Sequence, residues 1–380
     1  MDKRVMLAVA GSGKTYTLCN SINENEKNLI LAYTNENIHN IINELLKRYT
    51  YVPEKTEVMT FDKFIYQYII CPYEPTIRQF FNEPNFKRKG ITIQEPPKSS
   101  YKIGEIWRKN FNYPSQKELG HYHKEGKYYC SLLSELIIKV KKRPINLAQK
   151  AISNLNILFD KILIDEFQDF REYDYELITA FIKYCDNILL VGDYYQHSVS
   201  ANNNSGKPFS KRGKGENNKK DIISYEEYVN LLKKNGALVD TTTLIKSRRC
   251  PDNICQFIFK KLGIKIEADN DHKGNIYFLE GNEIIKILED DTIIKLVWQD
   301  KEKYHFKAEN WSYSKGDTYS SVCVILTDTF NNLNKDSFSI NGISPIPINK
   351  LYVAMSRTKG NLYFIQKKDF DKIKQKYIKR

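Results

Sequence analysis

Short apolar runs recur along the chain, and segments with helical spacing lie between them. Residues 161–165 (KILID) have the continuous apolar pattern of a strand buried on both faces. Similar runs at 5–9, 29–33 and 187–191 read as further buried strands. Apolar residues at helical spacing mark one face of a helix after the second run, at Ile38, Ile41, Ile42, Leu45 and Leu46. This alternation predicts an α/β fold with mainly parallel sheets flanked by helices.

Two acids follow the run at 161–165. Asp165 and Glu166 would emerge at the carboxyl end of the strand, where ligands bind in open α/β sheets. One carboxylate there can hold Mg²⁺ while its neighbour orients and deprotonates a water molecule. A helix whose first turn favours acids would explain the same pair without chemistry.

A glycine-rich turn follows the first apolar run, in VMLAVAGSGKT at 5–15. The backbone of Ala10, Gly11, Ser12 and Gly13 would curl around phosphate oxygens. Lys14 would reach the β- and γ-phosphates, and the Thr15 hydroxyl would ligate Mg²⁺. Ala8 stands where the strict pattern has glycine, yet each group that the phosphate cradle needs is present. The sequence therefore predicts a nucleotide site for ATP and Mg²⁺.

The charge balance is basic, with 59 Lys plus Arg against 46 Asp plus Glu. Such an excess favours a polyanionic partner, although a lysine-rich solvated surface would give the same balance. The seven cysteines lack CxxC spacing, so neither a disulfide framework nor a zinc site is indicated. Neither a signal peptide nor an apolar run near 18 residues is visible, which predicts no membrane association and a cytoplasmic, intracellular protein.

Several stretches in order resemble the superfamily 1 DNA helicases of the UvrD/Rep/PcrA type. They are the phosphate loop, LAYTN at 31–35, MTFDKF at 59–64, the acidic strand, GDYYQ at 192–196, KSRRC at 246–250, SKGDTY at 314–319 and YVAMSRTK at 352–359. The resemblance covers most of the chain from Val5 to Ile365. It implies two RecA-like P-loop domains with ATP between them.

The resemblance also implies roles for single residues. Glu166 would activate water, Gln196 would sense the γ-phosphate, and Arg249 and Arg357 would neutralise the charge developing on it. Gly316 and Thr318 match a ribose-binding stretch in which the family usually has glutamate at the threonine. Four residues would line a single-stranded DNA path, namely Tyr33, Thr34, Thr60 and Phe61. Asp62 replaces a usual histidine, and a carboxylate would repel a phosphate there.

The expected first domain covers 1–236 and the second 237–380. A small helical insert is expected at about 71–150, where Tyr101, Trp107, Phe111, Tyr122 and Tyr128 could stack on bases. Their alternative role is the core of the insert itself, which we expect for most of them. A polar loop at about 198–221, with six basic and two acidic residues, could be a mobile connection or a clamp on DNA.

Three departures from the resemblance bear on nucleotide choice and on size. The family's upstream glutamine segment is not seen before the phosphate loop, and the large insert of the second domain is missing. Arg248 stands where the family has a tyrosine that stacks on adenine. A guanidinium stacks on purines without distinguishing them, so we expect GTP to be hydrolysed within about tenfold of ATP.

Together these features predict an ATP-dependent translocase or helicase that moves along single-stranded or partly duplex DNA, 3′ to 5′ by resemblance. An ATPase subunit that works with a nuclease or another protein, without unwinding alone, is the alternative. A non-catalytic nucleic-acid-binding module is disfavoured by the intact lysine, acid pair and arginines.

Overall fold

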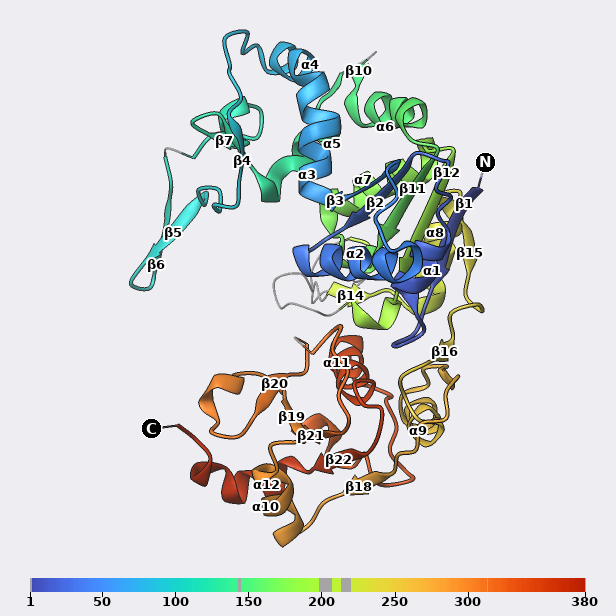
Figure 1. Cartoon of the computed structure of the whole chain (residues 1–380). Coiled ribbons are helices and arrows are strands. Elements are labelled where there is room, and N and C mark those ends of the chain that lie inside the picture. The colour runs from blue at the N-terminus through green and yellow to red at the C-terminus, as the bar shows by residue number, and fades with distance from the viewer. Residues whose placement is uncertain are drawn as a thin grey trace. The chain divides into compact units, whose positions relative to one another are not determined.

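The computed structural model describes residues 2–111, 113–142, 145–197, 207–212, 220–312 and 314–379. It has the expected α/β architecture with mainly parallel sheets (Figure 1). The chain forms two compact units. The first contains Met1–Arg4, Leu18–Leu190 and Leu232–Leu238, and the second contains Val5–Thr17, Val191–Leu231 and Val239–Arg380. These units do not coincide with the division expected at residue 236, because the phosphate loop and 191–231 group with the C-terminal part.

A six-stranded sheet carries the N-terminal motifs. Its order is β15 (Leu238–Asp240), β1 (Asp2–Leu7), β12 (Asn187–Gly192), β11 (Lys161–Asp165), β2 (Asn28–Ala32) and β3 (Thr56–Thr60). Strands β11 and β2 are parallel, with Lys161 opposite Asn28, and β2 is parallel to β3. All five residues of β2 are buried, as the continuous apolar runs predicted.

Helices in the described residues lie between these strands along the chain, and one of them covers the apolar positions from Ile38 to Leu46 as expected. They are α1 (Lys14–Asn20), α2 (Asn35–Tyr49), α6 (Leu147–Leu158), α7 (Glu172–Tyr184) and α8 (Tyr225–Lys234). In α2, Ile41 and Leu45 are buried. Helices α6 and α7 pack against each other.

The insert at 71–150 mixes helices and strands, and in this respect differs from the helical insert that the sequence suggested. A continuous helical stretch leads into it: α3 (Phe61–Phe64), the π-helix η1 (Ile65–Ile70) and α4 (Cys71–Phe81). Short strands follow, β4 (Gly90–Thr92), β5 (Ser100–Ile103), β6 (Ile106–Lys109), β7 (His123–Lys124) and β8 (Lys127–Tyr129), before α5 (Leu133–Lys139) and the pair β9 (Lys141–Lys142) and β10 (Ile145–Asn146). Strands β5 and β6 form an antiparallel hairpin (Figure 1). Prolines and glycines between the strands interrupt helical continuity.

The C-terminal part contains a five-stranded parallel sheet. Its order is β18 (Ile276–Phe278), β22 (Leu362–Ile365), β21 (Val322–Ile325), β19 (Ile294–Val297) and β20 (Ala308–Asn310). The α-helices among its described residues are α9 (Asp252–Leu262), α10 (Asn282–Glu289), α11 (Pro345–Met355) and α12 (Lys367–Ile373). Trp311, fully buried, packs with residues of α9, α11 and the sheet in one apolar core.

Two short strand pairs are also present in the described chain. A parallel pair, β16 (Lys246–Ser247) and β17 (Glu267–Ala268), precedes and follows α9. An antiparallel hairpin joins β13 (Ser210–Arg212) and β14 (Lys220–Ile222). Most of the basic loop expected at 198–221 lies outside the described residues. No helix in the described ranges is both long and apolar enough to cross a membrane.

Candidate functional site

The phosphate loop at 8–13 joins β1 to α1 through two glycines in the left-handed region. Gly11 has a φ of +73° and Gly13 a φ of +83°. A Cβ on Gly11 would lie 2.7 Å from both Arg249 Cβ and Ser247 Oγ, so glycine is needed for space as well as for conformation. The Ser12 hydroxyl donates to the Val9 carbonyl at 2.9 Å. The loop is thus held in the open-backbone shape that can surround phosphate oxygens, and Lys14 and Thr15 follow it as the first residues of α1.

Residues 244–248 lie against this loop within the same compact unit. The Val9 N–H donates to the Leu244 carbonyl, and the Arg248 N–H donates to the Gly11 carbonyl, both at 2.9 Å. The Arg248 guanidinium lies 4.9 Å from the centre of the Tyr16 ring. Arg248, which the sequence predicted to stack on the base, is therefore beside the phosphate loop and paired with an aromatic ring.

The acid pair stands at the carboxyl end of β11, as expected. Asp165 is 2% exposed, and its Oδ1 accepts the Glu166 N–H at 2.9 Å. Glu166 has a φ of +50°, which is strained for a residue with a Cβ, and its carboxylate accepts from Gln168 Nε2 at 2.5 Å. The backbone strain turns Glu166 out of the strand direction while Asp165 stays inside. The two carboxylates therefore lie in different environments, one buried and one partly exposed.

Asp193 and Gln196 form a buried pair after β12. Gln196 Nε2 donates to Asp193 Oδ2 at 2.6 Å, and the Tyr195 N–H donates to Oδ1 at 3.0 Å. Asp193 is fully buried and Gln196 is 2% exposed. The glutamine amide is consequently held in one orientation by a charged acceptor.

The two predicted arginines converge on Ser356. Arg249 Nη1 donates to the Ser356 carbonyl at 3.2 Å, and Arg357 Nη2 donates to the Ser356 hydroxyl at 3.2 Å. Arg357 is 1% exposed, and its other hydrogen bonds reach the carbonyl oxygens of Val353 and Ser314. Burial first, and then the charge of Arg249, lower the pKa of Arg357 to about 10. Two neighbouring cations, of which Arg357 is buried and Arg249 partly exposed, favour an anion beside them.

Part of the stretch expected to bind the ribose, residues 314–319, lies next to these arginines. Gly316 has a φ of +94°, and its carbonyl accepts from Arg249 Nη2 at 3.4 Å. Ser314 is fully buried and donates to the Trp311 carbonyl at 2.8 Å. Thr318 is exposed. Gly316 thus belongs to the arginine cluster, and the structure adds nothing specific for Thr318.

The four residues expected on the nucleic-acid path differ in the exposure and the hydrogen bonds of their side chains. Tyr33 is 40% exposed. The hydroxyls of Thr34 and Thr60 accept backbone N–H groups and cap α2 and α3. Phe61 is 2% exposed and packs against Phe170, 4.6 Å between ring centres. The Phe61 ring therefore offers no surface to a strand, which corrects the expectation for that side chain, and two of the other three have a structural explanation.

Tyr352 was not singled out from the sequence, although it opens the YVAMSRTK stretch. Its hydroxyl accepts the Ala10 N–H at 2.7 Å and donates to Asp193 Oδ2 at 3.3 Å. The signal that could have drawn attention to Tyr352 is its place in the same stretch as Arg357, five residues before it. Nothing in the local pattern, however, indicates its partners, which lie 342 and 159 residues away.

The comparison with protein families decides the family. The model of a family described as the AAA domain matches residues 2–202, which is more than half of the chain. The chain belongs to this AAA-domain family. In this AAA-domain protein the matched range contains the phosphate loop, the acid pair and Gln196. Membership supports nucleotide binding and hydrolysis by this part of the chain.

Solved structures similar to the AAA-domain protein include viral helicases. Arterivirus nonstructural protein 10 (helicase), solved with DNA and alone, is 13% and 12% identical over 95% of this chain, with TM-scores of 0.43. The PRRSV helicase is 12% identical over 99% of this chain, with a TM-score of 0.42. The chain covers 60%, 59% and 54% of those three chains. No curated protein matches.

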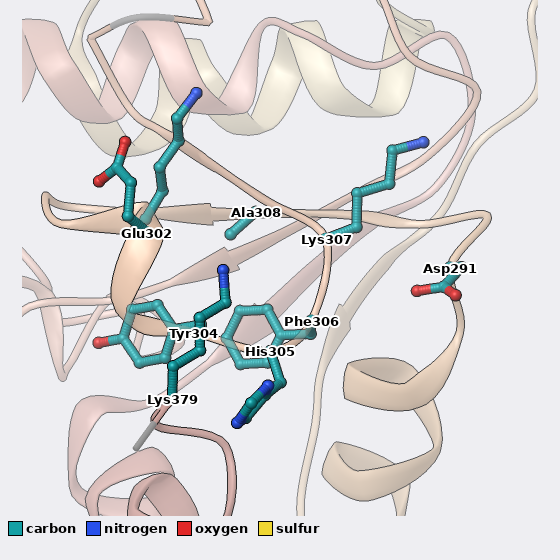
Figure 2. Close-up of a pocket in the computed structure, with 9 residues that line it drawn as sticks. Asp291, Glu302, Tyr304, His305, Phe306, Lys307, Ala308 and Lys379 are labelled. Atoms are coloured by element: carbon teal, nitrogen blue, oxygen red, sulfur yellow. The ribbon is translucent and has the colours of Figure 1, made fainter.

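An open pocket of about 620 Å³ lies elsewhere, near β20 and the C-terminal end of the AAA-domain protein (Figure 2). Its lining mixes Lys301, Lys307 and Lys379 with Asp291 and Glu302. None of the predicted nucleotide residues lines it. The mixed charge favours no particular ligand.

Proposed function

We propose that this protein is an ATP-dependent motor that moves along single-stranded DNA, a translocase or helicase. The observation that carries the proposal is the convergence of Arg249 and Arg357 on Ser356, together with a phosphate loop whose Gly11 backs directly onto Arg249. Two arginines are the groups expected to neutralise the charge that develops on a γ-phosphoryl group. The UvrD/Rep/PcrA type, and movement from 3′ to 5′, follow only from the sequence resemblance.

The residues fit a nucleotide with Mg²⁺. The left-handed glycines place no side chain in the turn at Gly11 and Gly13, and Lys14 follows directly. Asp165 and Thr15 would hold the ion, which when bound would offset phosphate charge. In the described residues no group of three or more histidines, cysteines or carboxylates could hold a metal by itself. That composition suits a Mg²⁺ that takes most ligands from water and phosphate. Glu166 would then accept the proton of the attacking water.

We also propose two RecA-like domains, divided near residue 236, with the arginines of the second acting on the nucleotide of the first. Gln196 would report the γ-phosphate through Asp193, to which it is hydrogen-bonded. Opening and closing of the two domains would then accompany each hydrolysis event. Alternate grip on a strand would produce stepping along it.

The β5–β6 hairpin supports a nucleic-acid partner. Trp107 and Tyr101 are 67% and 47% exposed, and Lys102 lies directly opposite Trp107 in the hairpin. Exposed aromatic rings next to cations are the features that bind single strands by stacking and charge. By contrast, Tyr122 and Tyr128 are 1% and 0% exposed and belong to the core of the insert.

The alternative is an ATPase subunit that moves or switches without unwinding alone and works with a nuclease or another protein. It shares the nucleotide chemistry and differs in the outcome of strand separation. DNA-stimulated hydrolysis without unwinding of a tailed duplex would favour this alternative.

The decisive experiment measures ATP hydrolysis with Mg²⁺, in the presence and absence of single-stranded DNA and RNA. We expect stimulation by single-stranded DNA, and loss of most of it in Trp107→Ala combined with Tyr101→Ala. Tyr51→Ala is the matched control, because Tyr51 is 52% exposed in the same compact unit but outside the insert. A rate of ATP hydrolysis that neither DNA nor RNA changes would refute the proposal of a motor. Absence of ATP hydrolysis would refute the proposal of an enzyme.

A further inference from the structure

Tyr352 lies on α11 and joins three nucleotide elements that are distant in sequence. Its hydroxyl contacts the phosphate loop at Ala10 and the buried acid Asp193, which in turn holds Gln196. Arg357 follows Tyr352 by five residues, and its Nε donates to the Val353 carbonyl at 2.8 Å. The helix that ends next to the arginine therefore also touches the loop and the glutamine pair. All of these residues belong to one compact unit.

These contacts have no access to water. Tyr352, Ala10 and Asp193 are each 0% exposed. Burial, and then the neighbouring Asp193 carboxylate, raise the pKa of Tyr352 well above its usual value, so the hydroxyl keeps its proton. A buried carboxylate depends on such donors, since a lost partner leaves charge uncompensated.

The arrangement around Asp193 Oδ2 is specific. That oxygen accepts from both Tyr352 and Gln196 Nε2, at 3.3 and 2.6 Å. The position of the glutamine amide therefore depends on an acid that the tyrosine ties to the phosphate loop. Movement of the Ala10 backbone would reach Gln196 through three hydrogen bonds, from Ala10 to Tyr352, from Tyr352 to Asp193 and from Gln196 to Asp193.

We propose that Tyr352 is a positioning residue that couples the phosphate loop to Gln196 through Asp193. The inference rests on the proposed function and assigns to it a connection outside the predicted catalytic set. The coupling sets the orientation of Gln196 when a triphosphate occupies the loop. It therefore affects the rate of the chemical step more than the affinity for nucleotide.

The competing explanation is that Tyr352 only fills the core. Its ring packs edge-on against Tyr195, 5.8 Å between ring centres. Phenylalanine would keep that packing and remove only the hydroxyl. Tyr352→Phe therefore separates the two explanations.

The test compares kcat for ATP hydrolysis with single-stranded DNA, and the Kd of a non-hydrolysable ATP analogue, in the full chain. For Tyr352→Phe we expect kcat to fall about tenfold or more, with the Kd changed less than threefold, because Lys14 and the glycine loop remain. In a Gln196→Ala background, Tyr352→Phe should cost less than a further twofold, since both act through one oxygen.

Tyr122→Phe is the matched control. Tyr122 is also buried, and its hydroxyl donates to the Gln116 carbonyl at 3.2 Å within the insert. It should keep kcat within twofold. Should Tyr352→Phe fail to fold, Asp193→Asn provides the second measurement and should give the same split between kcat and Kd.

Several outcomes overturn the inference. One is a kcat within twofold of the wild type for Tyr352→Phe. Another is a loss that multiplies fully with that of Gln196→Ala, which would mean independent action. A third outcome applies if Tyr352→Phe does not fold and Asp193→Asn does. In that case a normal kcat for Asp193→Asn overturns the inference. A wild-type protein that does not hydrolyse ATP would refute the proposed function itself, and the inference with it.

Discussion

Replacing Gly11 with alanine tests whether the contact between the phosphate loop and residues 247–249 belongs to the working enzyme. The added Cβ would lie 2.7 Å from Arg249 Cβ and from Ser247 Oγ. Arg249 Cβ is bonded to the backbone and cannot rotate away, and Ser247 Oγ is held by the N–H groups of Arg249 and Cys250, which donate to it at 3.3 and 3.1 Å. The segment itself must retreat.

The size of the effect follows from these distances. Ordinary contact begins at 3.4 Å, so the two segments must separate by about 0.7 Å. The left-handed φ of +73° adds strain of about 1–2 kcal/mol for an alanine. Because Arg249 moves with its segment, and a displacement near 1 Å of a catalytic group costs on the order of 100-fold, we expect kcat to fall about 10- to 100-fold.

Substitutions at two other glycines distinguish the effect of the steric clash from the effect of backbone strain. Gly342 has a φ of +81° with nothing within 4 Å of the added Cβ, so Gly342→Ala brings strain alone. Gly13 lies in the loop itself, with a φ of +83° and its nearest neighbour at an ordinary 3.7 Å. All three variants should melt a few degrees below the wild type. Gly11→Ala should combine this with the large loss of kcat, measured as DNA-stimulated ATP hydrolysis, whereas Gly342→Ala should keep kcat near that of the wild type.

A Gly11→Ala variant that melts like Gly342→Ala but hydrolyses ATP at the wild-type rate would refute this reasoning. It would mean that residues 247–249 do not lie against the loop during turnover. An equal loss in Gly13→Ala would assign the effect to the phosphate cradle instead of Arg249.

Three further predictions concern other parts of the protein. Glu166→Gln should abolish turnover yet retain ATP-dependent DNA binding, because the phosphate and metal ligands survive; near-normal hydrolysis would show that another group is the base. Burial raises the pKa of Asp174 to about 6. Ionisation of this carboxyl therefore lowers the free energy of unfolding by up to about 3 kcal/mol above pH 6. It has no effect below about pH 4, where the carboxyl is protonated in both the folded and the unfolded state. Asp174→Asn should accordingly raise the melting temperature at pH 7.5 but not at pH 4, and a gain at both would reject the titration. Stacking of Arg248 on the purine, as expected from the sequence, would not distinguish the bases, so kcat/KM for GTP should be within about tenfold of that for ATP. A preference above a hundredfold would reveal an unrecognised base-reading group.

The local chemistry of this protein is determined by residues that are neighbours in sequence. The left-handed turns at Gly11 and Gly13, Lys14 at the start of a helix, and the acids after a buried strand each follow from patterns of a few residues. The parallel sheets follow likewise from continuous apolar runs, because a strand buried on both faces has no polar side to show. The strand and the phosphate turn were therefore predictable from the sequence.

The aromatic residues of the insert show that local sequence patterns do not predict which of these side chains are buried. Trp107 and Tyr128 have similar neighbours, a lysine or arginine and other apolar residues, yet Trp107 is 67% exposed and Tyr128 is fully buried. The difference arises because Tyr128 lies in β8, paired with β4 and β7, whereas Trp107 lies in an isolated hairpin. Strand pairing between distant segments decided which ring packs inside, and a mixed insert replaced the helical one that the sequence suggested.

Tertiary structure alone decided how the separate motifs contact one another. The phosphate loop, Asp193 and Tyr352 each carry a recognisable local signal, but the two hydrogen bonds of the Tyr352 hydroxyl span 342 and 159 residues. Those bonds, and the place of Phe61 in the core instead of on a strand path, depend on packing that brings remote segments together and excludes water. Local periodicity determines which face of an element is apolar, whereas the partner that covers this face is chosen by the free energy of the whole folded chain.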